Sequence, residues 1–276
     1  MYKDKLIFIS EDYSAVGRMS LTAAEAVMSA FDFPVVGLPT QIFSTQTEGF
    51  GAPVALTVDE WQQQAFEHWK KAKITDFSSG LIGYIGKAEI AENLVNFINR
   101  HTFDRLVVDP VMGDQGSFYP GIFPEYASAI KRLGKNADVI TPNLFELGTL
   151  IGHEVEDVDG AINELTASTN PNLRVVATGI VRDNQIGVLY LDDSVLRWVG
   201  SPRVAGHFYG TGDLFAALLT GYLTAGLPFN RSVELSQHGT YLAVVKTANQ
   251  SESLRKFGMS LSATLADIIS NMQREK

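Results

Sequence analysis

Short runs of consecutive apolar residues recur along the chain, and each is followed by a longer segment with helical spacing. These runs do not alternate with polar residues. They are Leu6–Ile9, Val35–Leu38, Leu106–Val108, Val139–Ile140 and Val175–Ala177. Continuous apolar runs are typical of strands buried on both faces, and the segments between them leave room for crossover helices. The pattern therefore predicts an α/β protein with a mostly parallel sheet covered by helices.

Helical spacing of apolar residues indicates where those helices lie. The predicted helices span residues 19–31, 59–73, 87–100, 124–134, 143–151, 213–225 and 251–273. Between Ile186 and Val199, two β-rich pieces flank Asp192-Asp193-Ser194, which predicts an antiparallel hairpin at the sheet edge. The segment from Pro39 to Pro53 is predicted as an irregular loop, a type of segment that often contacts ligands. Because no linker or repeat interrupts the pattern, we expect one domain over residues 1–276.

Composition and charge narrow the classes of partner. The 276 residues carry a net charge of −9 with no basic stripe, which argues against nucleic acid as a partner. The chain has no cysteine, so disulfides, thiolate metal sites and a cysteine nucleophile are excluded. No apolar run approaches the roughly 18 to 20 residues of a membrane span, and Met1 to Lys5 with the run that follows are too short for a signal peptide. We expect a cytoplasmic protein with no membrane partner.

The strongest candidate for chemistry is Gly210-Thr211-Gly212-Asp213, which directly precedes an apolar helical pattern. The first backbone N–H groups of a helix have no partner within the helix, and they attract anions. Glycines let the backbone approach a ligand closely, and a carboxylate in the same turn can take a proton from a hydroxyl. These parts suit phosphoryl transfer to an alcohol. An ordinary glycine-rich turn with Asp213 as an N-terminal acid is the alternative at this point.

Polar groups also follow several of the predicted strands, where ligands bind in open α/β sheets. After Leu106–Val108 come Asp109 and Asp114 across a Pro and Gly turn, suited either to a hydrated Mg²⁺ or to a solvent-exposed turn. Ser10-Glu11-Asp12 follows the first strand in the same way, and Thr178 and Gly179 follow Val175–Ala177. Their convergence predicts a site at this edge of the sheet.

Thr141-Pro142-Asn143 and Glu146 follow the run Val139–Ile140. Asn143 and Glu146 have the spacing of a capping box, in which two side chains satisfy backbone N–H groups at a helix start. Glu146 is also placed to reach a metal-bound water and Asn143 to touch a phosphate. The two roles are compatible.

Several common signatures are missing. The nearest approach to a P-loop, Gly80 to Lys87, has the wrong glycine spacing, and Ala88 stands where a Mg²⁺-binding hydroxyl is required. No Gly-x-Gly-x-x-Gly follows a strand, and no Gly-x-Ser-x-Gly occurs. The five histidines lack metal-ligand spacing, although His207 is near enough to Asp213 in sequence to border a site there.

Taken together, these motifs resemble the ribokinase-like superfamily and, within it, the pyridoxal (pyridoxine, pyridoxamine) kinases. The motifs occur in the order of that family along most of the chain. They are Ser10 with Gly17-Arg18-Met19-Ser20-Leu21, Pro39-Thr40 through Thr47, Gly83-Tyr84-Ile85-Gly86, Asp109 to Asp114, Thr141 to Glu146, and Gly210 to Asp213. The resemblance implies a three-layer α/β/α fold with a mostly parallel central sheet and antiparallel edge strands.

The resemblance also implies an activity, namely ATP- and Mg²⁺-dependent transfer of a phosphoryl group to the 5′-hydroxyl of a B6 vitamer. Asp213 is then the general base, the amides of Gly210, Thr211 and Gly212 stabilise the transferring group, and Gly212 also contacts ATP. The residues implied around the vitamer ring are Ser10, Phe43, Thr47 and Tyr84. Those implied around the nucleotide phosphates are Asp109, Asp114, Thr141, Asn143, Glu146 and Thr178, with Asp109 and Glu146 acting through the metal. Residues 197–210 would border adenine and ribose, and the family suggests a homodimer.

Two departures from the family pattern and one added charge bear on the substrate. Relatives often carry histidine where Gln46 stands and a small residue where Lys87 stands, and Glu48 adds a charge near the implied ring pocket. The preferred vitamer and the need for a monovalent cation stay open. Competing hypotheses are a hydroxymethylpyrimidine kinase of the same superfamily, a sugar kinase, and a non-catalytic vitamer-binding protein. Asp213 argues mildly against the first, and the intact Gly210 to Asp213 motif argues against the last.

Overall fold

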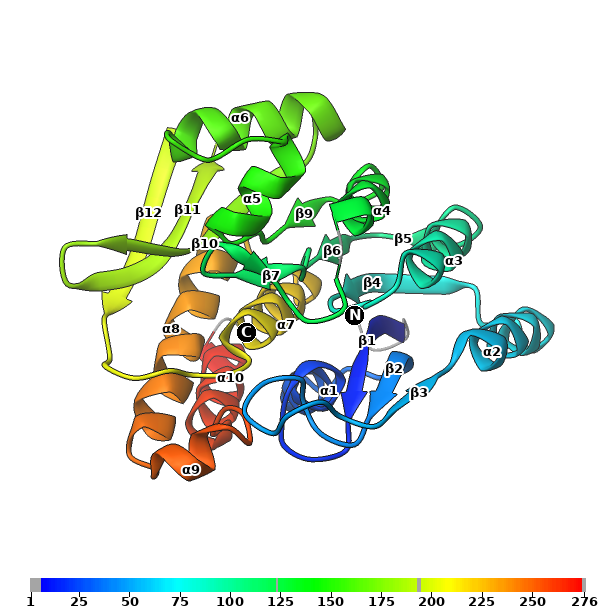
Figure 1. Cartoon of the computed structure of the whole chain (residues 1–276), viewed down its shortest axis with the longest axis horizontal. Coiled ribbons are helices and arrows are strands. Elements are labelled where there is room, and N and C mark those ends of the chain that lie inside the picture. Colours follow the sequence, from blue (N-terminus) through cyan, green and yellow to red (C-terminus); the bar gives the residue numbers. More distant parts are fainter. Residues whose placement is uncertain (1–5, 123, 193–194, 275–276) are drawn as a thin grey trace.

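A computed structural model describes residues 6–122, 124–192 and 195–274 of the chain (Figure 1). The expectations for Met1 to Lys5 and for Asp193 and Ser194 in the hairpin turn lie outside these residues. The main sheet has the strand order β12-β11-β10-β9-β6-β4-β1-β2-β3, with β5 paired to β4. Its strands are β1 (Leu6–Ser14), β2 (Val35–Phe43), β3 (Ala55–Thr57), β4 (Asp76–Ile82), β5 (Thr102–Phe103), β6 (Leu106–Val108), β9 (Val139–Ile140), β10 (Arg174–Arg182), β11 (Gln185–Asp192) and β12 (Val195–Pro202).

Strand directions confirm the predicted class. The pairs from β2 through β1, β4, β6 and β9 to β10 are parallel. The edges are antiparallel, with β3 on β2 at one end and β11 and β12 beyond β10 at the other. The predicted hairpin is therefore present as β11 and β12. A separate small ribbon pairs β7 (Gly113–Asp114) with β8 (Ser117–Phe118).

Helices cover the sheet on both faces (Figure 1). They are α1 (Ser20–Ala30), α2 (Asp59–Ala72), α3 (Ala88–Ile98), α4 (Pro124–Gly134), α5 (Leu144–Ile151), α6 (Val158–Thr169), α7 (Thr211–Thr224), α8 (Phe229–Ala248), α9 (Glu252–Arg255) and α10 (Ser262–Arg274). One buried cluster joins the sheet to α3, α4, α5 and α6, and a second joins it to α1, α7, α8 and α10. In β1, Phe8 belongs to the first cluster and Ile7 and Ile9 to the second, as expected for a strand buried on both faces.

The sequence pattern missed β4, α6 and α8. Strand β4 reads Asp-Phe-Ser-Ser-Gly-Leu-Ile, so it has no continuous apolar run, although Ser79 is buried and hydrogen-bonded to Thr224 at 2.6 Å. The buried face of α8 is partly polar. Its hydroxyls, for example those of Ser236 and Thr240, donate to carbonyls one turn earlier at 2.7 and 2.8 Å. Hydroxyls satisfied in this way can be buried, but they hide the helical period from an apolar pattern.

Two predicted boundaries were wrong. Residues 251–273 do not form one helix, because α9 and α10 are separated by a segment in which Gly258 has a φ of +85°. The predicted loop from Pro39 begins later, since Pro39 to Phe43 belong to β2. In the ranges 6–122, 124–192 and 195–274, no helix combines the length and apolar character needed to cross a membrane.

Candidate functional site

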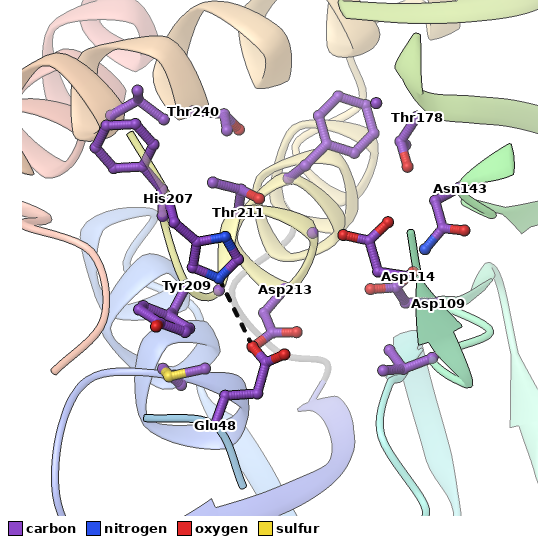
Figure 2. A pocket seen from close by; sticks show the side chains of 18 of the residues that line it. Glu48, Asp109, Asp114, Asn143, Thr178, His207, Tyr209, Thr211, Asp213 and Thr240 are labelled. Carbon is purple, nitrogen blue, oxygen red and sulfur yellow. Dashed lines mark ion pairs between the residues drawn. The ribbon is translucent and has the colours of Figure 1, made fainter. Parts of the chain in front are cut away.

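A cavity of about 1060 Å³ lies at the carboxyl ends of the parallel strands. It collects nearly all the predicted site residues, although they come from distant parts of the chain. Those in its lining are Phe43, Thr47, Tyr84, Asp109, Asp114, Thr141, Asn143, Glu146, Thr178, Gly210, Thr211, Gly212 and Asp213. The convergence expected from the strand ends is thus present (Figure 2).

Ser10 is the exception among the predicted site residues. It is fully buried within β1, between Leu38 of β2 and Ile82 of β4, and it does not line the cavity. Within the described part of the chain its hydroxyl has no hydrogen-bond partner. The wall is formed instead by Asp12 and Ser14 farther along the same strand.

The start of α7 forms the corner that the sequence singled out. Gly210 precedes the helix with a φ of +79°, a left-handed conformation that glycine adopts without strain. Gly212 in the first turn lies beside Asp109, since a Cβ atom there would lie 3.6 Å from Asp109 Oδ2. The first N–H groups of the helix, which have no partner within it, are therefore near the strand-end acid.

Asp213 is fixed by the start of another helix. Its Oδ2 accepts hydrogen bonds from the Ser20 backbone N–H at 2.9 Å and from Ser20 Oγ at 3.1 Å. Burial raises the pKa of Asp213, and the two Ser20 bonds oppose that shift. Figure 2 shows its carboxyl in the cavity, between Glu48 on one side and Asp109 on the other. Ser20 belongs to one of the motifs that resemble the kinase family, but the sequence analysis predicted no role for it.

Asp109 and Glu146 form a pair of buried acids near this corner. Burial, followed by the charge of Asp213, raises the pKa of Asp109 to about 7, while Thr141 Oγ1 donates to its Oδ1 at 2.9 Å. Burial and the charge of Asp109 also raise the pKa of Glu146. A divalent cation would stabilise the ionised form of both side chains.

The predicted capping box is present at α5. Asn143 accepts from the Glu146 N–H at 3.0 Å, and Glu146 Oε2 accepts from the Asn143 N–H at 2.9 Å. Glu146 Oε1 accepts from the Met112 N–H at 3.0 Å. Since both Glu146 oxygens already accept a backbone bond, Glu146 fits a metal-bound water better than a direct metal bond. Asp109 fits direct coordination, so the donor set suits Mg²⁺, which keeps most of its waters.

The opposite end of the cavity is less polar and was only partly predicted. Ser201, Pro202, Val204 and Phe208 fall within the predicted 197–210 segment. Beside them the wall is completed by residues of β11 and α8, namely Ile186, Gly187, Val188, Gln237, Thr240, Tyr241 and Val244. The α8 residues were missed because the helix itself was missed.

The loop between β2 and β3 contributes Gln46, Thr47 and Glu48 to the cavity lining. Glu48 Oε2 lies 3.9 Å from His207 Nε2, which links this loop to the segment before α7 (Figure 2). Gln46 Nε2 donates to the Lys256 carbonyl at 2.5 Å, and the Phe50 and Phe257 rings lie 5.3 Å apart. Gln46 therefore docks the loop on the C-terminal segment. Lys87 precedes α3 and lies outside the cavity lining.

Comparison with known proteins shows that the chain is similar to kinases of small heterocyclic compounds. The chain matches the phosphomethylpyrimidine kinase family over residues 45–257. Pyridoxine/pyridoxal/pyridoxamine kinase of Bordetella avium (strain 197N) is 36% identical over 188 residues, which are 63% of this chain and 62% of that protein. Hydroxymethylpyrimidine/phosphomethylpyrimidine kinase of Bacillus subtilis (strain 168) is 26% identical over 214 residues, 75% of this chain and 77% of that protein.

A solved structure extends the likeness to the whole fold. Pyridoxal kinase from Lactobacillus plantarum is 33% identical, with a TM-score of 0.94 and coverage of 99% of each chain. By contrast, the match spans only 53% to 62% of the length of several curated pyridoxal kinases. Because the family match covers well over half of the chain, the predicted resemblance is confirmed, and the chain belongs to the phosphomethylpyrimidine kinase family with the fold of a pyridoxal kinase.

Proposed function

We propose that this protein is an ATP-dependent kinase that phosphorylates the 5′-hydroxymethyl group of a B6 vitamer, with Asp213 as the general base. The position of Asp213 is the observation that carries the proposal. Its carboxyl lies in the cavity, held by Ser20, in the same turn as the free N–H groups of α7. A hydroxyl bound there loses its proton to Asp213 as the N–H groups stabilise the charge on the transferring phosphoryl group.

The nucleotide is proposed to occupy the side of the cavity bordered by β11, the segment before α7 and α8. An apolar wall that includes Val188, Val204 and Val244 suits a flat heteroaromatic base. From there, triphosphate oxygens reach Asn143, Thr178 and the start of α7, all of which line the same cavity. Asp114 lies on the exposed β7–β8 ribbon at this side.

Mg²⁺ is proposed to bind at Asp109, with Glu146 acting through water. When bound, it would neutralise charge on the phosphates. Thr141 orients Asp109 through its hydroxyl, and Met112 and Asn143 orient Glu146 through their backbone N–H groups. These contacts fix both acids before any substrate enters.

The vitamer ring is proposed to pack against Phe43 and Tyr84, whose rings contact each other edge to face with centroids 6.1 Å apart. Thr47 and Glu48 of the loop between β2 and β3 also line this end. Asp12, beside Tyr84, adds a carboxylate to the same end.

Hydroxymethylpyrimidine is the second candidate acceptor, favoured by the Bacillus subtilis relative and by the family match. It also carries a hydroxymethyl group on a flat nitrogen heterocycle, so the same catalytic arrangement would serve it. The choice between the two depends on the ring-binding end of the cavity.

One assay tests the proposal. Purified protein is incubated with ATP and Mg²⁺ and, separately, pyridoxal, pyridoxamine, pyridoxine or hydroxymethylpyrimidine, in sodium and in potassium buffers. Product mass identifies the phosphorylated species, and a reaction without acceptor measures background ATP hydrolysis. A phosphorylated vitamer is expected. Vitamer binding without product from any acceptor would instead indicate a binding protein and overturn the kinase proposal.

Three further expectations accompany this function as proposals. They are a homodimer, a cytoplasmic location and one domain over residues 1–276. Light scattering after size-exclusion chromatography tests the first, since a dimer would have twice the chain mass of 30.2 kDa.

A further inference from the structure

Two consecutive acids of β1, Glu11 and Asp12, are both buried at the end of the cavity that the aromatic pair Phe43 and Tyr84 also borders. Glu11 is 1% exposed and Asp12 is 7% exposed. The register between β1 and β2 shifts between Glu11 and Tyr13, so the strand is irregular at Asp12. Asp12 lines the cavity, whereas Glu11 lies behind it against Gly83, where any side chain would collide with the Glu11 carboxyl.

Asp12 lies close to the proposed base. Asp12, Ser20 and Asp213 all line this cavity, and Ser20 Oγ donates to Asp213 Oδ2 at 3.1 Å. The charge of Asp213 is also one of the causes that raise the pKa of Asp12, so the two carboxyl groups are close enough to interact. When the hydroxymethyl group of an acceptor reaches Asp213, the substituent on the neighbouring ring carbon therefore lies near Asp12.

The carboxyl groups of Glu11, Asp12 and Asp213 have few hydrogen-bond donors around them. A hydroxyl has one proton to donate, and the proton of Ser20 Oγ goes to Asp213. Asp12 Oδ2 accepts from Ser14 Oγ at 2.9 Å, but Glu11 Oε2 has no hydrogen-bond partner among the residues that the structure describes. Buried acceptors without donors are unfavourable, and a ligand that brings an N–H group into the cavity would give Asp12 a further donor.

The acidic side chains at this end of the cavity favour a ligand that carries a cationic or neutral hydrogen-bond donor. Burial and the nearby charges of Asp213, Asp12 and Asp109 raise the pKa of Glu11. The described cavity lining offers Arg203 and His207 as basic side chains, and His207 is already paired with Glu48.

We propose that Asp12, supported by Glu11, determines acceptor specificity by accepting a hydrogen bond from an amino or aminomethyl group on the ring carbon next to the hydroxymethyl group. This inference rests on the proposed kinase function. Asp12 would select acceptors that carry a nitrogen donor at this position over acceptors that carry an aldehyde, because an aldehyde oxygen can only accept a hydrogen bond. Pyridoxamine brings a cationic aminomethyl group and hydroxymethylpyrimidine a neutral amino group, so both belong to the class.

The test compares kcat/KM for pyridoxamine, hydroxymethylpyrimidine and pyridoxal in the wild type and in Asp12→Asn. The wild type is expected to favour at least one nitrogen-bearing acceptor over pyridoxal by tenfold or more, as expected for a charge-assisted hydrogen bond. In Asp12→Asn this ratio should fall by about tenfold, because an amide is a weaker acceptor. Whichever nitrogen-bearing acceptor loses more identifies the donor as cationic or neutral.

Asp114→Asn is the matched control, since it neutralises a carboxylate in the same cavity on the nucleotide side. It should lower the rate with every acceptor by a similar factor and leave the ratio unchanged. A wild-type preference for pyridoxal, or the same ratio in Asp12→Asn and wild type, would overturn the inference while leaving the kinase function intact. If no acceptor is phosphorylated at all, the proposed function itself fails.

A binding measurement keeps the inference testable if Asp12→Asn does not fold. Calorimetry on the wild type without ATP compares pyridoxamine, hydroxymethylpyrimidine and pyridoxal directly. Tighter binding of a nitrogen-bearing ring by about tenfold supports the inference. Equal or weaker binding of both nitrogen-bearing rings contradicts it.

Discussion

Replacement of Asp213 tests the catalytic proposal most directly, because this side chain has two separable roles in the structure. It is the proposed base, and it accepts two hydrogen bonds from Ser20 at the start of α1. Loss of a general base should lower turnover by about 10²- to 10⁴-fold. At 1.36 kcal/mol per factor of ten, this corresponds to about 3 to 5 kcal/mol of transition-state stabilisation.

Two variants separate the roles. Asp213→Ala removes both the base and the acceptor for Ser20, so it should also lower the free energy of unfolding by about 1 to 3 kcal/mol. Asp213→Asn keeps an oxygen that can accept from Ser20 but cannot take the proton of the acceptor hydroxyl. We therefore expect a similar loss of turnover in both variants and a loss of stability mainly in the alanine variant.

Three measurements on each variant decide the outcome. Single-turnover formation of phosphorylated product gives the rate of the chemical step, calorimetry gives ATP affinity, and denaturant unfolding gives stability. ATP affinity should change little, because the proposed phosphate contacts do not involve the Asp213 carboxyl. If Asp213→Asn retains near-normal turnover while Asp213→Ala is inactive, then Asp213 anchors α1 and is not the base.

The remaining predictions concern the metal, the pH dependence and the packing. Asp109→Asn should raise the Mg²⁺ concentration for half-maximal rate by about tenfold or more, and Glu146→Gln should raise it as well; unchanged Mg²⁺ titrations in both would refute the metal assignment. The pKa of Asp109 rises from 3.8 to about 7 in the folded protein, so the folded state retains a proton that the unfolded chain loses. Stability without Mg²⁺ should therefore fall as pH rises from about 4 to 7, and more steeply than in Asp109→Asn; parallel melting curves across this range would contradict the shift. Gln46→Ala should free the loop from the C-terminal segment, raising KM for the acceptor and speeding proteolysis within residues 44–54, whereas wild-type cleavage would argue against docking. Gly221→Ala should cost about 1 to 3 kcal/mol in chemical unfolding, because a methyl group there would overlap the Phe31 ring; an unaltered midpoint would show that the ring moves away.

The features that could be predicted from the sequence depend on residues close together in the chain. The Asn143 and Glu146 capping box depends on residues three apart, and the Gly210 to Asp213 corner depends on one turn. Both are present in the structure. The convergence of the strand-end acids was also predictable, because parallel strands bring their carboxyl ends to one edge.

The features that sequence reasoning missed depend on contacts between distant segments. Strand β4 lies near the centre of the sheet, and its Ser79 accepts a hydrogen bond from Thr224, a residue of α7 far away in sequence. The role of Ser20 depends on Asp213, which is 193 positions away. Asp12 was named only as one of the polar residues that follow the first strand, and its burial becomes apparent only in the folded structure.

The burial of α7 explains why a single turn can position the proposed base. From Leu214 to Thr224 every residue of the helix is buried, packed against the sheet and against α1 and α8. Glycines along it allow this close packing, since Gly221 meets the Phe31 ring and Gly239 of α8 meets Leu218. A helix held along its whole length cannot shift its first turn without repacking the core, which is costly in a close-packed interior. The N–H groups at its start and Asp213 are therefore held in place before substrate binds, and such preorganisation lowers the reorganisation needed in the transition state.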